Sequence, residues 1–190
     1  LWPVAGALRT ALIFYLILTR ENSIRITARQ CKITLALIAI AYFLVISAVI
    51  LHQYRQGELF NMKDFNNYHE TFENTIRGKF FQNTLYGSNF ACHNTWFYLL
   101  ILPFYCAVPH PMTPMIIKTA LLSLSVIPFY LNAKLHVKEE AIIPLTLCFL
   151  FFPYIVSQNF LPPHEIAYLP FFLLFTVYFF KTHSFRRFLL

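Results

Sequence analysis

Three ionisable residues stand beside apolar segments, where a charge is costly unless it has a function. Asp64 begins the stretch DFNNYHETFENTIRG, and His164 and Glu165 follow two prolines in QNFLPPHEIAYLP. Ionisable groups near hydrocarbon commonly face a water-filled cavity and serve function. Two carboxylates and an imidazole at one cleft would provide a general base, or oxygen ligands for Mg²⁺ or Mn²⁺. Asp64 and Glu165 are therefore the candidate catalytic residues and the candidate metal ligands.

Structural roles are an alternative for the same residues. Glu165 follows a Pro-Pro pair, and the helix dipole favours a carboxylate in the first turn of a helix. Asp64 is a preferred residue for the N-cap of a helix. His69 and Glu70 would then lie on the exposed face of that helix, and His93 in ACHNTW would be a structural residue at an interface.

The composition predicts that the chain lies in a membrane. Hydrophobic residues make up 58% of it and charged residues 12%, whereas soluble domains carry about 25% charged residues. Several uncharged runs approach the roughly 20 residues that a helix needs to cross a bilayer. These runs are apolar on all sides and lack the alternation of transmembrane β-strands. We therefore expect an all-α polytopic membrane protein in contact with the lipid bilayer.

The apolar runs predict about five transmembrane helices in a single transmembrane domain, 1–190, which we expect to be a segment of a longer protein. The predicted helices cover residues 1–19, 33–51, 115–131, 141–156 and 166–180. The net charge of +7 is best explained by topology, because Lys and Arg collect in cytoplasmic loops. The basic stretch RENSIRITARQCK, the link NAKLHVKEE and the chain end after Phe180 are accordingly assigned to the cytoplasm. No nucleic-acid partner is expected.

Residues 52–112 are predicted to form an outer-face loop with interfacial helices. Apolar residues at 65, 68, 72 and 76 have helical spacing, so this helix is expected to lie on the membrane surface. The run 96–108 contains Pro103 and would extend only about 20 Å as a helix, too short to cross. We interpret it as a re-entrant or interfacial arm closed by the turn PHPMTP. Asp64 and the His164–Glu165 pair then lie at one membrane face, whereas a full crossing of 96–108 would separate them.

The order of these motifs resembles a family of predicted prokaryotic membrane proteins, domain of unknown function 2079. The resemblance covers about residues 60–181. Asp64 corresponds to an Asp after a spanning helix, and Gly78 to the Gly that ends an aromatic-rich segment. His93 corresponds to a His before a Pro-interrupted apolar run, and His164–Glu165 to a later His-Glu motif after a Pro. The chain departs from the family where Phe65-Asn66 follow Asp64 and where Pro163 replaces a common aromatic residue.

That family is similar in layout to the GT-C class of membrane glycosyltransferases, so the chain would be a GT-C-like N-terminal portion. The resemblance implies a sugar transferase that uses a polyprenyl-phosphate sugar as donor and a glycan or a lipid as acceptor. It casts Asp64 as the catalytic base or a metal ligand, and Glu165, His164 and His93 as groups around the substrate. The site would lie at the outer face of a prokaryotic cytoplasmic membrane.

Two other classes of function stay open at this stage. A transporter or lipid-handling protein would use Glu165 as a proton or cation site, although the chain shows none of the internal repeats typical of transporters. A non-catalytic membrane scaffold would use the same charges only as helix caps. The sequence therefore leaves open whether the protein is an enzyme.

Overall fold

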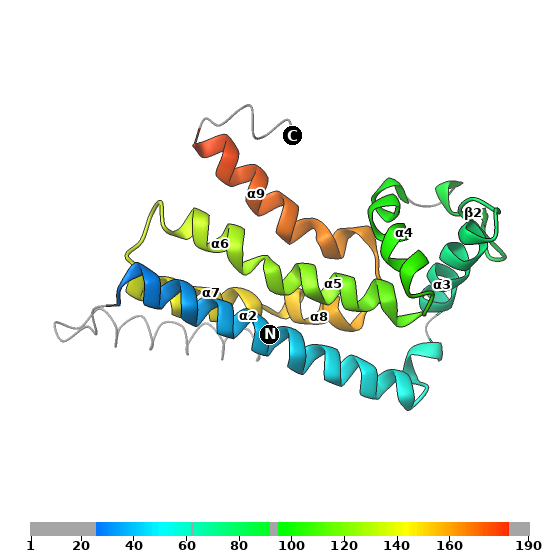
Figure 1. Cartoon of the computed structure of the whole chain (residues 1–190), viewed down its shortest axis with the longest axis horizontal. Coiled ribbons are helices and arrows are strands. Elements are labelled where there is room, and N and C mark those ends of the chain that lie inside the picture. The colour runs from blue at the N-terminus through cyan, green and yellow to red at the C-terminus, as the bar shows by residue number, and fades with distance from the viewer. Residues whose placement is uncertain (1–25, 62, 92–94, 183–190) are drawn as a thin grey trace.

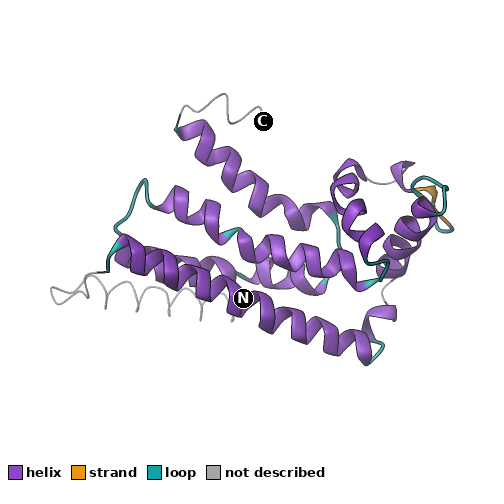
Figure 2. Cartoon of the chain, viewed as in Figure 1, coloured by secondary structure: helices purple, strands orange, loops and turns teal. Residues whose placement is uncertain are grey.

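The computed structural model describes residues 26–61, 63–91 and 95–182, and most of them are helical (Figures 1 and 2). The predicted first helix, 1–19, lies outside the described residues. The α-helices are α2 (Ala28–Arg55), α3 (Lys63–Ile76), α4 (Tyr98–Ala107), α5 (Met112–Leu124), α6 (Val126–Ala133), α7 (Glu139–Leu150), α8 (Pro153–Phe160) and α9 (Leu169–Lys181). Short 3₁₀ helices are η1 (Glu58–Asn61), η2 (Asn89–Ala91), η3 (Thr95–Phe97) and η4 (Glu165–Tyr168). The strands β1 (Gln82–Asn83) and β2 (Gly87–Ser88) pair antiparallel, and they were not predicted.

Helix α2 confirms the predicted helix at 33–51, extends beyond it at both ends, and is a candidate membrane span. It begins at a capping box, in which the Gln30 amide donates to Thr27 Oγ1 at 3.3 Å and the Thr27 amide donates to Gln30 Oε1 at 3.0 Å. Its 28 residues span about 42 Å, more than the hydrocarbon core. The ends of α2 therefore reach past the apolar part of a bilayer.

The predicted crossing at 115–131 is the α5–α6 path, a candidate span from Met112 to Ala133. The predicted crossing at 141–156 is instead a pair of helices, α7 and α8, bent by 47°. The bend occurs because Phe152 precedes Pro153 and is extended, with φ −60° and ψ 130°. The ring of a proline disfavours helical conformation in the residue before it.

Four of the five predicted crossings fall on described residues, and two or three candidate membrane spans are found there. By length and composition α2 and the α5–α6 path can cross a membrane, and the bent α7–α8 pair would be a third span. The last predicted helix, 166–180, is shorter than expected, because Glu165–Tyr168 form the 3₁₀ helix η4 and α9 has only 13 residues. Helix α9 extends about 20 Å and packs on α6, where the Asn132 side chain donates to the Leu174 carbonyl at 2.7 Å.

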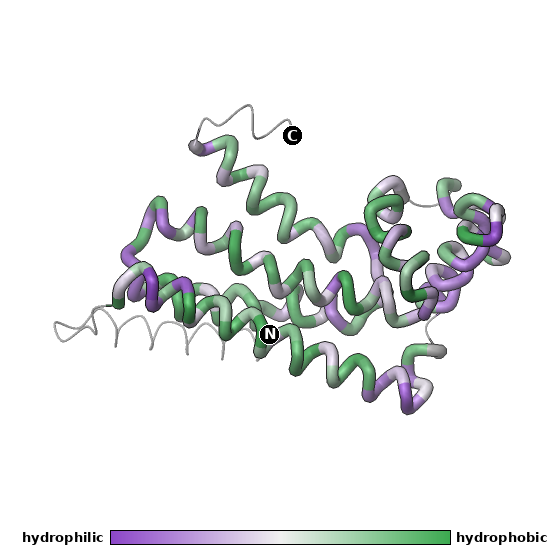
Figure 3. The backbone as a smooth tube through the Cα atoms, viewed as in Figure 1, coloured by the Kyte–Doolittle hydropathy of each residue, from purple (hydrophilic) through white to green (hydrophobic). Residues whose placement is uncertain are grey.

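The described parts of the segments assigned to the cytoplasm lie together at one end of the helices, as a shared side would require (Figure 1). Cys31 Sγ lies 3.7 Å from the Glu139 carbonyl at the start of α7. Lys134 Nζ lies 3.9 Å from Glu139 Oε1, and Lys181 Nζ lies 3.1 Å from His136 Nε2. Hydrophilic residues gather mainly at this end and at the opposite end, with hydrophobic residues between (Figure 3).

The opposite end is built by α3, α4 and the β1–β2 hairpin. Helix α3 confirms the predicted amphipathic helix, but Phe65, Tyr68 and Phe72 are buried in the protein and only Ile76 is exposed. The face predicted to lie on the membrane is covered because α4 packs against it, with the Phe72 and Tyr105 rings stacked at 5.1 Å. Helix α4 has 10 residues with Pro103 inside and extends about 15 Å. This length agrees with the prediction that 96–108 is too short to cross.

Polar side chains fix the hairpin against α3. Gly78 follows the end of α3 with a φ of +85°, a conformation that favours glycine after a helix. The Asn83 side chain is buried and donates to Thr71 Oγ1 at 3.0 Å and to Asn89 Oδ1 at 3.3 Å. Its own oxygen accepts from the Tyr86 amide at 2.8 Å.

Replacing Asn83 by Ala is expected to lower the free energy of unfolding by about 1–3 kcal/mol, because buried partners lose their hydrogen bonds. The measurement is thermal unfolding of the purified protein in detergent, followed by circular dichroism. Gln82→Ala is the matched control, since the Gln82 side chain is exposed and its loss should change the unfolding little. Equal unfolding of both variants would contradict the role of Asn83.

Candidate functional site

The structure brings Asp64 next to His164, as the predicted layout requires. Asp64 lies in the first turn of α3, one residue inside the helix and not at its N-cap. Its Oδ2 atom is 3.6 Å from His164 Nε2, and the two side chains are 44% and 28% exposed. Both groups are therefore accessible to solvent or substrate while they lie at ion-pair distance.

The other ring nitrogen of His164 is held by Tyr68. The Tyr68 hydroxyl and His164 Nδ1 share a hydrogen bond of 2.7 Å, and the two rings meet edge to face at 5.3 Å. This contact joins residues 96 positions apart in the chain. It fixes the orientation of the imidazole and leaves Nε2 directed at Asp64.

A second tyrosine holds the segment before His164. The buried Tyr98 hydroxyl donates to the Pro163 carbonyl at 2.8 Å. The rings of Tyr68 and Tyr98 pack edge to face at 5.3 Å. On the other side, the buried Lys118 of α5 donates from Nζ to the Leu161 carbonyl. Residues 161–164 are thus anchored from α3, α4 and α5 at once.

Glu165 lies in the first turn of η4, which agrees with the alternative prediction that it stabilises a helix start. The N-cap residue itself is His164. The Oε1 atom of Glu165 is buried and has no hydrogen-bond partner among the described residues. Buried carboxylate oxygens normally accept a hydrogen bond. An additional donor, such as water or a bound molecule, would complete this site.

The charge of Glu165 acts on three buried tyrosine hydroxyls, and that of Asp64 acts on one of them. Burial raises the pKa of the Tyr68 hydroxyl, and the charges of Glu165 and Asp64 raise it further. Burial also raises the pKa of Tyr98 and of Tyr168, again with a contribution from Glu165. These hydroxyls therefore stay protonated at neutral pH. Those of Tyr68 and Tyr98 bond to His164 and to the Pro163 carbonyl, and that of Tyr168 has no partner among the described residues.

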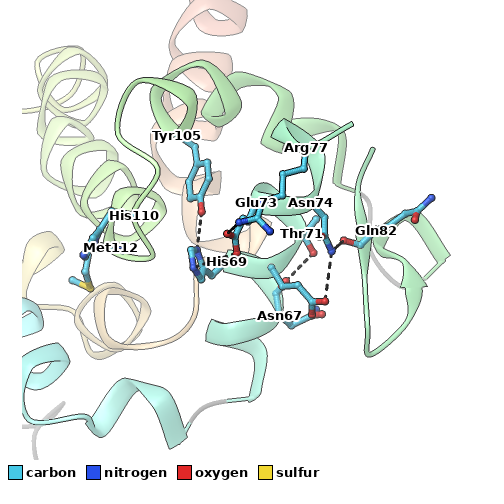
Figure 4. Close-up of polar contacts among 11 residues, drawn as sticks. Asn67, His69, Thr71, Glu73, Asn74, Arg77, Gln82, Tyr105, His110 and Met112 are labelled. Atoms are coloured by element: carbon cyan, nitrogen blue, oxygen red, sulfur yellow. Dashed lines mark hydrogen bonds and ion pairs between the residues drawn. The ribbon is translucent and has the colours of Figure 1, made fainter. Parts of the chain in front are cut away.

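A separate polar network runs along α3 (Figure 4). His69 Nδ1 and the Tyr105 hydroxyl share a hydrogen bond of 2.7 Å. His69 Nε2 lies 4.0 Å from Glu73, which pairs with Arg77 at 2.6 Å. Burial lowers the pKa of His69. The expectation that His69 simply faces solvent is wrong, because α4 covers this part of α3.

Glu70, the other residue expected on an exposed face, also has a structural role. Its carboxylate accepts from the Thr84 amide at 3.1 Å and from the Thr84 hydroxyl at 2.6 Å. It therefore joins α3 to the segment after β1.

The residues of the candidate site are thus not all those that the sequence predicted. Asp64, His164 and Glu165 lie together, whereas His93 lies outside the described residues. Tyr68 and Tyr98 were missed, since sequence reasoning assigned the aromatic residues to the core or to lipid contact. The sequence pointed to Tyr68 only through its helical spacing from Phe65 and Phe72. Such spacing indicates that a side chain is buried, but not that it forms a hydrogen bond.

The described residues do not supply a metal site built by the protein alone. No group of three His, Cys, Asp or Glu side chains among them is arranged to hold a metal ion. His164 Nδ1 is already bonded to Tyr68, so this ring could offer only Nε2. Asp64 and His164 would therefore need further ligands from a substrate or from water.

Comparison with known proteins agrees with the family resemblance in the sequence. No curated protein and no solved structure matches this chain. A family model described as "Predicted membrane protein (DUF2079)" matches residues 64–190. The match begins at Asp64, includes His164 and Glu165, and covers more than half of the chain. The chain therefore belongs to the DUF2079 family of predicted membrane proteins.

Proposed function

We propose that the Asp64–His164 pair is the general base of a membrane-embedded sugar transferase with a GT-C-like layout. The observation that carries the proposal is the 3.6 Å approach of Asp64 Oδ2 to His164 Nε2, with Nδ1 held by Tyr68. A carboxylate oriented by a fixed imidazole, and partly exposed, is suited to proton transfer. Contacts of this kind are often longer before substrate binds and shorten in the complex.

In the proposed reaction an acceptor hydroxyl of a glycan or lipid attacks the anomeric carbon of a polyprenyl-phosphate sugar. The hydroxyl proton passes to the Asp64 carboxylate, and the new C–O bond forms as the bond from the anomeric carbon to the phosphate oxygen breaks. The lipid phosphate leaves with the bonding electrons. Of the tyrosine hydroxyls near Glu165, only that of Tyr168 has no partner among the described residues, so it is the one suited to donate a hydrogen bond to a sugar or a phosphate oxygen.

Glu165 has a supporting role in this proposal. Its unpartnered buried oxygen would accept a hydrogen bond from a sugar hydroxyl and so orient the substrate. Paired carboxylates are the usual equipment for chemistry at an anomeric carbon. Mg²⁺ or Mn²⁺ stays a prediction, because a cation between Asp64 and Glu165 would need substrate phosphate oxygens to complete its ligands. No step of the proposed reaction passes through a metal.

A second candidate function rests on the same buried oxygen of Glu165. A buried carboxylate oxygen without a partner among the described residues could bind and release a proton or a cation, as transporters require. On this alternative the protein is a transporter or lipid-handling protein, and Asp64–His164 forms one end of a polar path. The site would lie at the outer face of a prokaryotic cytoplasmic membrane in either case.

Asp64→Asn is expected to reduce sugar transfer by about 10²- to 10⁴-fold, the usual contribution of a general base, and Glu165→Gln is expected to reduce it as well. Products are measured in proteoliposomes supplied with polyprenyl-phosphate sugars and candidate acceptors, with and without Mg²⁺. Glu73→Gln is the control on the same helix, since Glu73 pairs with the exposed Arg77. Normal product from both site variants would rule out the proposed reaction.

Tyr68→Phe is expected to reduce the rate of transfer by roughly tenfold, since it removes one hydrogen bond that orients the His164 ring. Nitrogen NMR of the His164 side chain should show a changed signal for Nδ1 in this variant, which a purely structural role would not produce. Tyr154→Phe, at an exposed ring, is the control. An unchanged His164 spectrum would show that Tyr68 does not hold the imidazole.

Proteoliposomes that contain a pH-sensitive or cation-sensitive dye separate the two candidate functions. The transferase proposal predicts no flux that depends on Glu165. Flux in the wild-type protein that is lost in Glu165→Gln, without any sugar product, would favour the transporter alternative.

A further inference from the structure

A groove lies between α2 and the α5–α6 path, at the end of the molecule away from Asp64 and His164. Its volume is about 470 Å³, and its lining includes Lys32, Leu35 and Ile40 from α2 and Leu124, Ile127 and Tyr130 from the opposite side. This volume falls in the range of sites that bind small molecules, about 300–1,000 Å³. The groove has no part in the proposed transfer reaction.

The groove is lined almost entirely by apolar side chains and is open at its side. Ile40, Leu124 and Ile127 are 55%, 44% and 49% exposed. A polar ligand would lose hydrogen bonds to water along such a lining without replacement. Because both walls belong to candidate membrane spans, hydrocarbon chains of the bilayer are the molecules that reach this opening.

The shape of the groove suits an extended chain. From Lys32 to Ile40 the wall of α2 runs along about 12 Å of helix. The facing wall runs in the opposite direction, from Tyr130 back to Leu124. The groove is therefore a slot along the helix axes, with its polar residues at one end only.

Basic residues mark that end. Lys32 is exposed at the mouth of the groove, and Arg29 is exposed one turn earlier on the same face of α2. Neither side chain has an ion pair with another residue that the structure describes. Two cations without an ion-pair partner among the described residues, at the end of an apolar slot, provide a site for an anion attached to hydrocarbon.

One acidic residue nearby, Glu139, is already engaged. Tyr130 donates from its hydroxyl to Glu139 Oε1 at 3.3 Å, and Lys134 Nζ lies 3.9 Å from the same atom. The described residues at this end carry five basic side chains against two acidic ones: Arg29, Lys32, Lys134, Lys138 and Lys181 against Glu139 and Glu140. The surplus positive charge favours an anionic headgroup.

We propose that this groove binds one acyl chain of an anionic phospholipid, with the lipid phosphate held by Lys32 and Arg29. The chain lies along Leu35, Ile40 and Leu124, and the phosphate lies at the level of the basic loop residues. Bound lipid fills the space between α2 and the α5–α6 path, and it ties the protein to a leaflet rich in anionic lipid.

The test uses the purified protein reconstituted in phosphatidylcholine vesicles that contain spin-labelled phosphatidylglycerol or spin-labelled phosphatidylcholine. Electron spin resonance should show a motionally restricted component that is larger for phosphatidylglycerol. Lys32→Gln is expected to lower this preference by roughly fivefold, the effect of one basic residue at a bilayer surface. Lys79→Gln removes an exposed charge at the other end of the molecule and should leave the preference unchanged.

A steric variant tests the groove itself. Ala36→Trp fills the slot and is expected to reduce the restricted component for both lipids, whereas Leu37→Trp, at a residue 62% exposed and outside the groove, should not. Unchanged preference in Lys32→Gln would overturn the proposal whether or not Ala36→Trp folds. A wild-type protein with no restricted component would also overturn it, and would indicate that residues 1–25 or a second copy of the chain fill the groove.

Discussion

The arrangement of the polar end depends on the packing of tyrosine rings between α3 and α4. Tyr68 and Tyr98 meet edge to face at 5.3 Å, and their hydroxyls reach the segment that follows α8. One hydroxyl bonds to His164 Nδ1 and the other to the Pro163 carbonyl. Large aromatic rings contribute apolar burial, while a buried hydroxyl requires a partner. Each ring thus stabilises the core and also determines where the loop must lie.

The rigidity of this loop has a physical cause in its prolines and its anchors. Pro162 and Pro163 restrict the backbone before His164, and Lys118 holds the Leu161 carbonyl from α5. A buried lysine is costly unless its donors find acceptors, so this contact is expected to persist. The imidazole therefore faces Asp64 from a segment that three helices hold, and such preorganisation is what a general base requires.

The two ends of the molecule differ in chemistry as well as in sequence. At one end Lys32 lines an open apolar groove, and the surplus charge of the described residues there is positive. At the other end carboxylates, imidazoles and tyrosine hydroxyls lie in a packed aromatic cluster. Separation of this kind is expected if the candidate spans cross a membrane, because ionisable groups are costly at hydrocarbon depth. It also keeps the proposed lipid site and the proposed transfer site independent.

The sequence by itself determined the membrane-helical class, helices α2 and α3, and the choice of Asp64, His164 and Glu165, since hydropathy, periodicity and isolated charges are local properties. It predicted the ends and bends of two helices poorly. Pro153 bends the α7–α8 pair, and α9 begins later than predicted because the 3₁₀ helix η4 precedes it. Only the tertiary structure decided that α4 covers α3 and that Tyr68 holds His164. Such contacts join residues 96 positions apart, and a single sequence carries no signal for which buried ring will face which imidazole. The two residues of the predicted His-Glu pair therefore have different surroundings. His164 faces Asp64, whereas one buried oxygen of Glu165 has no hydrogen-bond partner among the described residues.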